Sequence, residues 1–253
     1  MSNFIAMPPT SGSFSSGGLS TSGEKTLGSS LAEDSAKNAL FDFYRMSACI
    51  SHELGTILPQ LKMRLAVAES CTSGLLGTTI TQVSGASNWF EGGILSYSNE
   101  MKHNLLGVEE KVLKTFGAVS APTVCQMASG VCSAAKCHFG LSISGIAGPN
   151  GGSMEKPVGT VFIGLSLPKN FASLRKKIKV KKGKALENGM EQNWLKSCQL
   201  MKHIYLQQES KTVVLGAFET RARHFLFEGD RESIRQSATL MALYFAYENL
   251  LGE

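Results

Sequence analysis

The chain has 253 residues, of which 43% are hydrophobic, so it can bury a full core and fits one domain of ordinary size with additions. It has no apolar run of about eighteen residues and no basic N-terminal segment followed by an apolar one, so we expect neither a membrane span nor a secretory signal. The six cysteines form no C-x-x-C pair, and no paired histidine spacing accompanies them. We therefore expect a cytoplasmic protein with reduced thiols and without a metal site or a membrane partner.

The N-terminal part of the chain is rich in serine and glycine, and its first 23 residues carry no charged side chain. This composition cannot form a packed core, so we expect residues 1–30 to be a disordered leader and residues 31–253 to form the folded domain. Ser30-Leu31-Ala32-Glu33 has the form of a capping box. The apolar residues after it, including Leu40, Phe41 and Tyr44, predict a helix or a helix pair that ends near Pro59.

Strand-like and helical segments alternate from residue 63 onward. Strands are expected at 63–69, 92–98, 139–145, 158–167 and 220–228, and helices near 72–82, 99–116, 121–137 and 230–251. In the last helix, Ile234, Ala238, Met241 and Phe245 recur at helical spacing, which predicts a buried stripe. The fold class that we expect is α/β, a three-layer α/β/α sandwich with a central mixed sheet in a single domain.

The first strand ends on Glu69-Ser70-Cys71-Thr72, and small residues after it are expected to open a helix. Backbone N–H groups at a helix start, together with the helix dipole, can stabilise negative charge that develops beside a serine hydroxyl, as acyl transfer requires. The same pattern also fits a helix cap. Cys71 is a rival nucleophile, because a thiol in the first turn of a helix can have a depressed pKa.

A serine nucleophile needs a base, and no matching histidine is present, so the candidates are Lys102 and Tyr97. A lysine can serve if burial lowers its pKa, and a tyrosine can relay the proton. The structural alternative makes Tyr97 an aromatic residue at a strand end and Lys102 a charge on a helix surface.

Two further segments are candidates for ligand binding. Ser144–Gly152 is glycine-rich but lacks the Gly-Lys-Ser/Thr ending of a Walker A loop, so its glycines allow either close approach to a ligand or a tight connection between strands. Arg231 follows Gly229-Asp230 at the start of the last helix, where a guanidinium group and unpaired N–H groups can bind an anion. Alternatively, Asp230 only caps the helix and Arg231 is solvated.

Several of these motifs, in this order, resemble the CinA C-terminal family, whose members include nicotinamide mononucleotide deamidases. The resembling segments are, in chain order, Glu69-Ser70-Cys71-Thr72, Tyr97–Lys102, Gly117–Ser120, Ser144–Gly152, Lys156–Val161 and Gly229–Arg231. The resemblance covers roughly residues 60–167 and 225–251, and it rests on separate motifs rather than on one short pattern. Ser73 departs from it, because the family more often has glycine there.

The resemblance implies an amidohydrolase that converts nicotinamide mononucleotide to nicotinate mononucleotide and ammonia in pyridine nucleotide recycling. It implies that Ser70 is the nucleophile and that Lys102 and Tyr97 move protons. For the small-molecule nucleotide substrate it implies binding by Thr72, Ser144, Gly145 and Arg231, with Ser144 holding either the substrate amide or the lysine. It also implies a homo-oligomer and no metal or organic cofactor.

Residues 168–219 interrupt the family pattern and are expected to be an insertion. Seven positive charges and no negative one lie between residues 175 and 184, and without them the formal net charge of +5 would become −2. Such a run favours a solvated loop, since blocks of like charge are commonly disordered. The alternative is a non-catalytic binding protein of the same fold that uses this basic run to bind nucleic acid or a protein partner.

Overall fold

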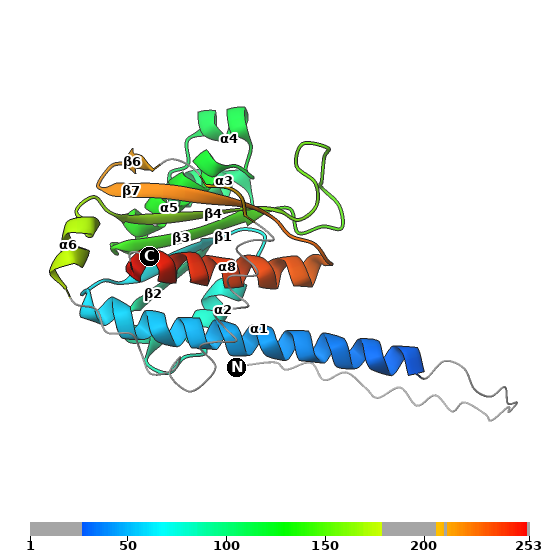
Figure 1. Cartoon of the computed structure of the whole chain (residues 1–253). Helices are drawn as coiled ribbons and strands as arrows, with labels where there is room; N and C mark the ends of the chain where they lie inside the picture. Colours follow the sequence, from blue (N-terminus) through cyan, green and yellow to red (C-terminus); the bar gives the residue numbers. More distant parts are fainter. Residues whose placement is uncertain (1–26, 179–205, 210–211, 252–253) are drawn as a thin grey trace, which may run out of the picture. The chain divides into compact units, whose positions relative to one another are not determined.

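The computed structural model describes residues 27–178, 206–209 and 212–251 (Figure 1). The chain divides into two compact units, Met1–Ala39 and Leu40–Glu253. The boundary falls within helix α1 (Leu27–Gln60), so the second unit contains the rest of α1 and all other elements.

A mixed sheet forms the centre of the second unit. Its strands are β1 (Leu65–Glu69), β2 (Phe90–Leu95), β3 (Phe139–Gly145), β4 (Thr160–Pro168), β5 (Leu206–Glu209), β6 (Val213–Leu215) and β7 (Phe218–Leu226). The order is β2-β1-β3-β4-β7-β5, and β6 also pairs with β7. Strands β2, β1 and β3 are parallel, whereas β4, β7, β5 and β6 pair antiparallel with their neighbours. Strand β1 is buried along its whole length, as expected of an inner parallel strand.

Helices cover both faces of this sheet (Figure 1). The helices after α1 are α2 (Leu75–Thr81), α3 (Asn99–Leu106), α4 (Glu110–Phe116), α5 (Ala121–Ala135), α6 (Phe171–Lys177) and α8 (Arg231–Leu251). Helix α5 packs across β1, β3, β4 and β7 on one face, and α8 packs on β3, β4 and α2 on the other. Two separate hydrophobic clusters on the two sides of the sheet confirm the predicted three-layer α/β/α sandwich.

Two details of the expected helices are wrong, whereas the end of the first helix near Pro59 is confirmed, because α1 ends at Gln60. Helix α1 begins at Leu27, so Ser30 lies inside it and not at its start. The helix expected over 99–116 is two helices, because Gly107 adopts the left-handed conformation (φ 64°) that ends α3. The leader residues 1–26 lie outside the described part of the chain.

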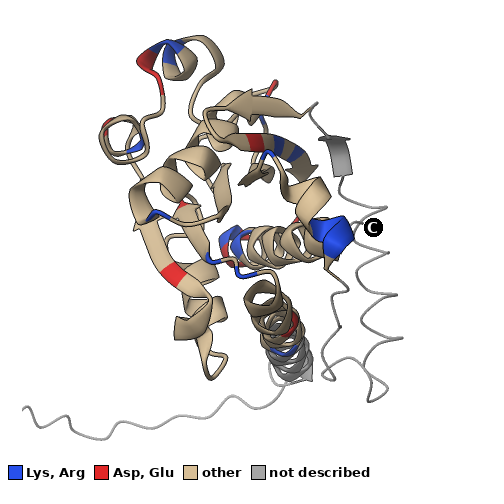
Figure 2. Ribbon diagram, turned by 90° about the vertical axis from the view of Figure 1, so that its left-hand side faces the viewer, with Lys and Arg blue, Asp and Glu red and all other residues tan. Residues whose placement is uncertain are grey.

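The insertion at 168–219 is in part regular structure, because it supplies α6, β5, β6 and the start of β7. Arg175 of its basic run is not a solvated charge: its guanidinium group donates hydrogen bonds to the carbonyl oxygens of Leu250 and Leu251 (2.7 and 2.6 Å). These carbonyls end α8, where cations are favoured. Figure 2 shows the basic turn of α6 beside this end of the chain. Lys179, Lys181, Lys182 and Lys184 lie outside the described residues.

Candidate active site

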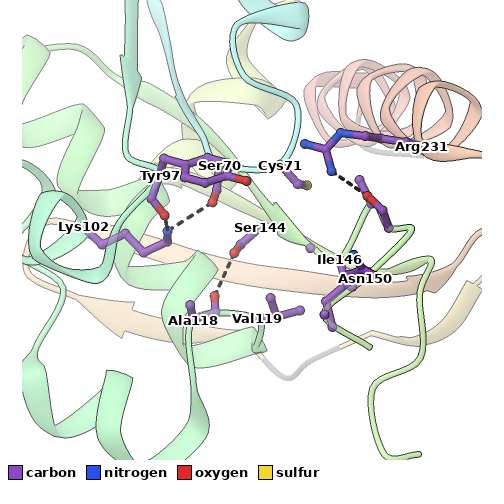
Figure 3. Close-up of a pocket in the computed structure, with 14 residues that line it drawn as sticks. Ser70, Cys71, Tyr97, Lys102, Ala118, Val119, Ser144, Ile146, Asn150 and Arg231 are labelled. Carbon is purple, nitrogen blue, oxygen red and sulfur yellow. Dashed lines mark hydrogen bonds between the residues drawn. The ribbon is translucent and has the colours of Figure 1, made fainter. Parts of the chain in front are cut away.

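A pocket of about 260 Å³ lies where β1, β2 and β3 end (Figure 3). Ser70 follows β1, Tyr97 follows β2, and Ser144 and Gly145 end β3. Because these strands are parallel, their carboxyl ends meet at one edge of the sheet, where α/β proteins commonly bind ligands. The pocket is lined by Ser70, Cys71, Tyr97, Lys102, Ala118, Val119, Ser144, Gly145, Ile146, Ala147, Gly148, Asn150, Gly151 and Arg231.

Ser70 and Lys102 meet in this pocket. Lys102 is only 1% exposed, and its Nζ lies 3.1 Å from Ser70 Oγ. It also donates hydrogen bonds to the backbone carbonyls of Ser96 (2.7 Å) and Tyr97 (3.0 Å) (Figure 3). Burial penalises the charged form and lowers the pKa of Lys102 to about 8. The structural alternative of a surface charge is therefore wrong for Lys102, which is buried against the hydroxyl of Ser70.

Helix α3 places Lys102 in the pocket. The helix begins directly after the turn that follows β2, and Ser98 caps it by accepting a hydrogen bond from the backbone N–H of Met101 (3.1 Å). Lys102 follows in the first turn, so its side chain returns toward the carboxyl end of β2. The Ser98 cap thus fixes the start of α3 and with it the place where Lys102 enters the pocket.

The turn after β1 differs from the expected helix start. Helix α2 begins at Leu75, so Ser70 is separated from it by a turn. The first N–H groups of the helix are occupied by the buried carboxylate of Glu69, which accepts hydrogen bonds from Gly74, Leu76 and Gly77 (2.9, 3.1 and 2.9 Å). These donors are unavailable to an oxyanion, contrary to our expectation. No backbone carbonyl of the described residues accepts a hydrogen bond from the N–H groups of Cys71 and Thr72.

The role of Glu69 was missed in the sequence, although an acidic residue at the end of an otherwise apolar strand is a signal for it. Arg235 of α8 was missed as well: its guanidinium group donates a hydrogen bond to the carbonyl of Thr72 (2.9 Å) and thus holds the turn from the other side. Ser73 adopts a left-handed conformation (φ 51°), which glycine adopts more readily. The turn is therefore fixed by contacts that overcome the local preference of Ser73.

Cys71 lines the pocket but is poorly suited to be the nucleophile. Its side chain is 5% exposed, and burial raises the pKa of the thiol to about 12. A thiol with this pKa remains protonated near neutral pH, whereas the thiolate is the reactive form. The geometry thus favours Ser70 over Cys71.

Tyr97 contacts Lys102 through its backbone, not through its phenol. Its side chain is 69% exposed at the pocket, and its hydroxyl makes no hydrogen bond with any described residue. In Figure 3 the ring extends from the Lys102 side of the pocket toward Cys71. The structure therefore offers no direct contact for the expected proton relay.

The remaining predicted residues divide into those that line the pocket and one that does not. Ser144 lines it, but its hydroxyl donates to the carbonyl of Ala118 (2.8 Å) and does not hold Lys102. Gly145 lines it too, and a Cβ there would lie 2.8 Å from the carbonyl oxygen of Thr160, so close strand packing requires glycine. Thr72 does not line the pocket, and it is fully buried.

Asp230 caps α8 as predicted, whereas anion binding by Arg231 stays a prediction. Asp230 accepts a hydrogen bond from the backbone N–H of Ser233 (2.8 Å) and caps α8, and this bond lowers the pKa of its carboxyl group. Arg231 is not simply solvated, because it lines the pocket and donates to the carbonyl of Gly148 (2.7 Å) (Figure 3). This contact holds the guanidinium group at the glycine-rich loop, where an anionic group of a ligand can reach it.

The fold and the site together define a class of protein, an α/β sandwich that holds a serine hydroxyl against a buried lysine at the carboxyl edge of its sheet. The model of the CinA C-terminal domain family matches residues 48–196, which is more than half of the chain. The chain therefore belongs to the CinA C-terminal domain family. In the described residues, no helix is long and apolar enough to cross a membrane, and no three His, Cys, Asp or Glu side chains are grouped to hold a metal ion.

Relatives carry two kinds of name. A CinA-like protein of Leptospira biflexa is 40% identical over 192 residues, which are 76% of this chain and 34% of the relative, so the chain spans about a third of that protein. The nicotinamide-nucleotide amidohydrolase PncC of Enterobacter agglomerans is 50% identical over 117 residues, which are 46% of this chain and 71% of the relative.

Solved structures share the fold. The competence damage-inducible protein A of Klebsiella pneumoniae is 24% identical, with a TM-score of 0.58 over 81% of this chain and 96% of that one. The competence/damage inducible protein CihA of Agrobacterium tumefaciens is 25% identical, with the same TM-score over 82% of this chain and 96% of that one. The sandwich is thus an architecture already found in this superfamily.

Proposed function

We propose that this protein is an amidohydrolase that converts nicotinamide mononucleotide to nicotinate mononucleotide and ammonia. The observation that carries the proposal is the contact of 3.1 Å between Ser70 Oγ and the buried Nζ of Lys102. A hydroxyl with a base of lowered pKa within hydrogen-bond reach is an activated nucleophile for acyl transfer. The name of the Enterobacter relative supports this choice of substrate.

In the first half of the reaction, neutral Lys102 accepts the proton of Ser70 as Oγ attacks the carboxamide carbon. The N–H groups of Cys71 and Thr72, which donate to no backbone carbonyl of the described residues, would stabilise the oxyanion. Lys102 then passes the proton to the amide nitrogen, the C–N bond breaks, and ammonia leaves. An ester between Ser70 and the nicotinoyl group remains.

In the second half, water attacks this ester while Lys102 accepts a water proton. The ester C–O bond breaks, and Lys102 returns the proton to Ser70. The product acid loses its own proton to solvent and leaves as a carboxylate. Arg231 would bind an anionic group of the nucleotide, the 5′-phosphate or the new carboxylate. Each half of the reaction thus uses the same base, and no redox partner is required.

The direct test is ammonia release from nicotinamide mononucleotide by the purified full chain. Ser70→Ala should reduce turnover on the order of 10⁶-fold, as loss of the nucleophile does in studied serine hydrolases. Cys71→Ala is the matched control and should retain substantial activity. Turnover by Ser70→Ala near the wild-type rate, or loss of turnover only in a folded Cys71→Ala variant, would overturn the assignment.

A further inference from the structure

The ring of Tyr97 lies at the pocket without a role in the proposed reaction. The role that we give it here rests on the proposed function. We propose that the face of this ring binds the positively charged pyridinium ring of the substrate and makes the site selective for N1-substituted pyridinium amides. Tyr97 would then be a specificity-determining residue rather than a proton relay.

The charges of the pocket leave a cationic ring without an ion-pair partner. Among the described residues that line the pocket, the charged ones are Lys102 and Arg231, and none is acidic. An aromatic face attracts a flat cationic ring and can stack on it, and Tyr97 is the aromatic residue in this lining. The Tyr97 ring is therefore the surface on which a pyridinium ring would stack.

The position of Tyr97 suits this contact. Lys102 Nζ binds both Ser70 Oγ (3.1 Å) and the backbone carbonyl of Tyr97 (3.0 Å), so one ammonium group holds the nucleophile and the aromatic residue side by side. The carboxamide carbon that Ser70 attacks is bonded directly to the pyridine ring. The substrate ring must therefore lie next to Ser70, within the reach of the Tyr97 side chain.

The Tyr97 ring is also available. It is 69% exposed, and its hydroxyl makes no hydrogen bond with a described residue, so a ligand can cover the ring without breaking a protein contact. Proton transfer through the hydroxyl and binding through the ring face make opposite predictions for two substitutions. Tyr97→Phe removes the hydroxyl and keeps the aromatic face, whereas Tyr97→Leu removes both.

The test measures binding in the Ser70→Ala background, where turnover does not interfere. The two ligands are nicotinamide mononucleotide and its reduced form, which has the same carboxamide, ribose and phosphate but an uncharged ring. Tyr97→Leu should weaken binding of the charged ligand by about 2- to 30-fold, the range of a cation–π contact, and should weaken the reduced ligand clearly less. Tyr97→Phe is the matched control and should leave both affinities nearly unchanged.

Equal weakening of both ligands by Tyr97→Leu, no weakening, or absence of measurable binding to the Ser70→Ala protein would overturn the inference. Weakening by Tyr97→Phe as large as that by Tyr97→Leu would assign the effect to the hydroxyl and overturn it as well. The proposed function is judged separately: selective binding without ammonia release by the wild type refutes hydrolysis and leaves the aromatic contact standing. Ammonia release without charge-selective binding supports hydrolysis and refutes the aromatic contact.

Discussion

Lys102 shows how burial changes the chemistry of a single residue. An exposed lysine is almost fully protonated at neutral pH, but the buried Nζ of Lys102 has a pKa of about 8. The unfolded chain therefore binds more protons at this residue than the folded protein does between about pH 8 and the usual lysine pKa. Over that window the contribution of Lys102 to stability rises with pH.

The same pKa predicts the pH dependence of the reaction. In the proposed reaction neutral Lys102 is the active form, so kcat/KM for ammonia release should rise about tenfold per pH unit below pH 8 and level off above it. Lys102→Ala should lower kcat by roughly 10²- to 10⁴-fold and abolish this rise. Initial rates between about pH 6 and 9.5 measure both effects, with Ser70→Ala as the background. A flat profile in the wild type would show that Lys102 is not the base.

At the scale of elements, the turn between β1 and α2 is held by groups that never touch the substrate in the proposed reaction. Glu69 accepts three N–H groups at the start of α2, and Arg235 of α8 binds the carbonyl of Thr72. Satisfying these buried groups matters, because an unpaired polar group in the interior is costly. Together they fix the direction in which Ser70 leaves the sheet.

Glu69→Gln should therefore harm both stability and catalysis. The amide has one acceptor oxygen in place of two and brings an NH₂ group toward backbone donors, so we expect the free energy of unfolding to fall by about 1–3 kcal/mol. Displacement of Ser70 should lower kcat by roughly 10- to 100-fold with less change in KM. Denaturant melts and rates well below the melting temperature measure the two effects.

Glu100→Gln is the control for that substitution, because Glu100 is an exposed acid in the first turn of α3. It should behave as the wild type. If Glu69→Gln kept wild-type stability and kcat, the carboxylate would not position the turn.

At the scale of the whole molecule, the residues that line the pocket all belong to the unit Leu40–Glu253. Removing residues 1–26 should therefore leave the melting temperature nearly unchanged and kcat/KM within about twofold. Thermal melts and ammonia release by the shortened chain test this. A tenfold loss of activity in a folded protein would show that the N-terminal segment takes part in the reaction.

A second truncation that also removes α1 provides the contrast. Ile50, Leu54 and Leu58 of this helix are fully buried in the hydrophobic cluster shared with α8 and the sheet. Their loss would expose one face of the core, so this chain should fail to fold cooperatively.

The sequence by itself determined the order and type of most elements and the residues that could react. Periodicity is a property of near neighbours, and it was sufficient to predict the strands around 65–69 and 139–145, the helix at 231–251 and the sandwich that they form. Periodicity was insufficient where the backbone conformation of one residue determines the end of a helix. Gly107 is such a residue, because it divides one expected helix into two.

Only the tertiary structure decided the chemistry of the site. It brought Lys102 to Ser70 across 32 positions of the chain, buried the lysine enough to lower its pKa, and buried the thiol of Cys71 enough to keep it protonated. It also paired the N–H groups at the start of α2 with Glu69 and buried Thr72 outside the pocket lining. The physical reason is that burial and long-range hydrogen bonds depend on where the ends of separate strands and helices meet, which no local pattern of residues specifies.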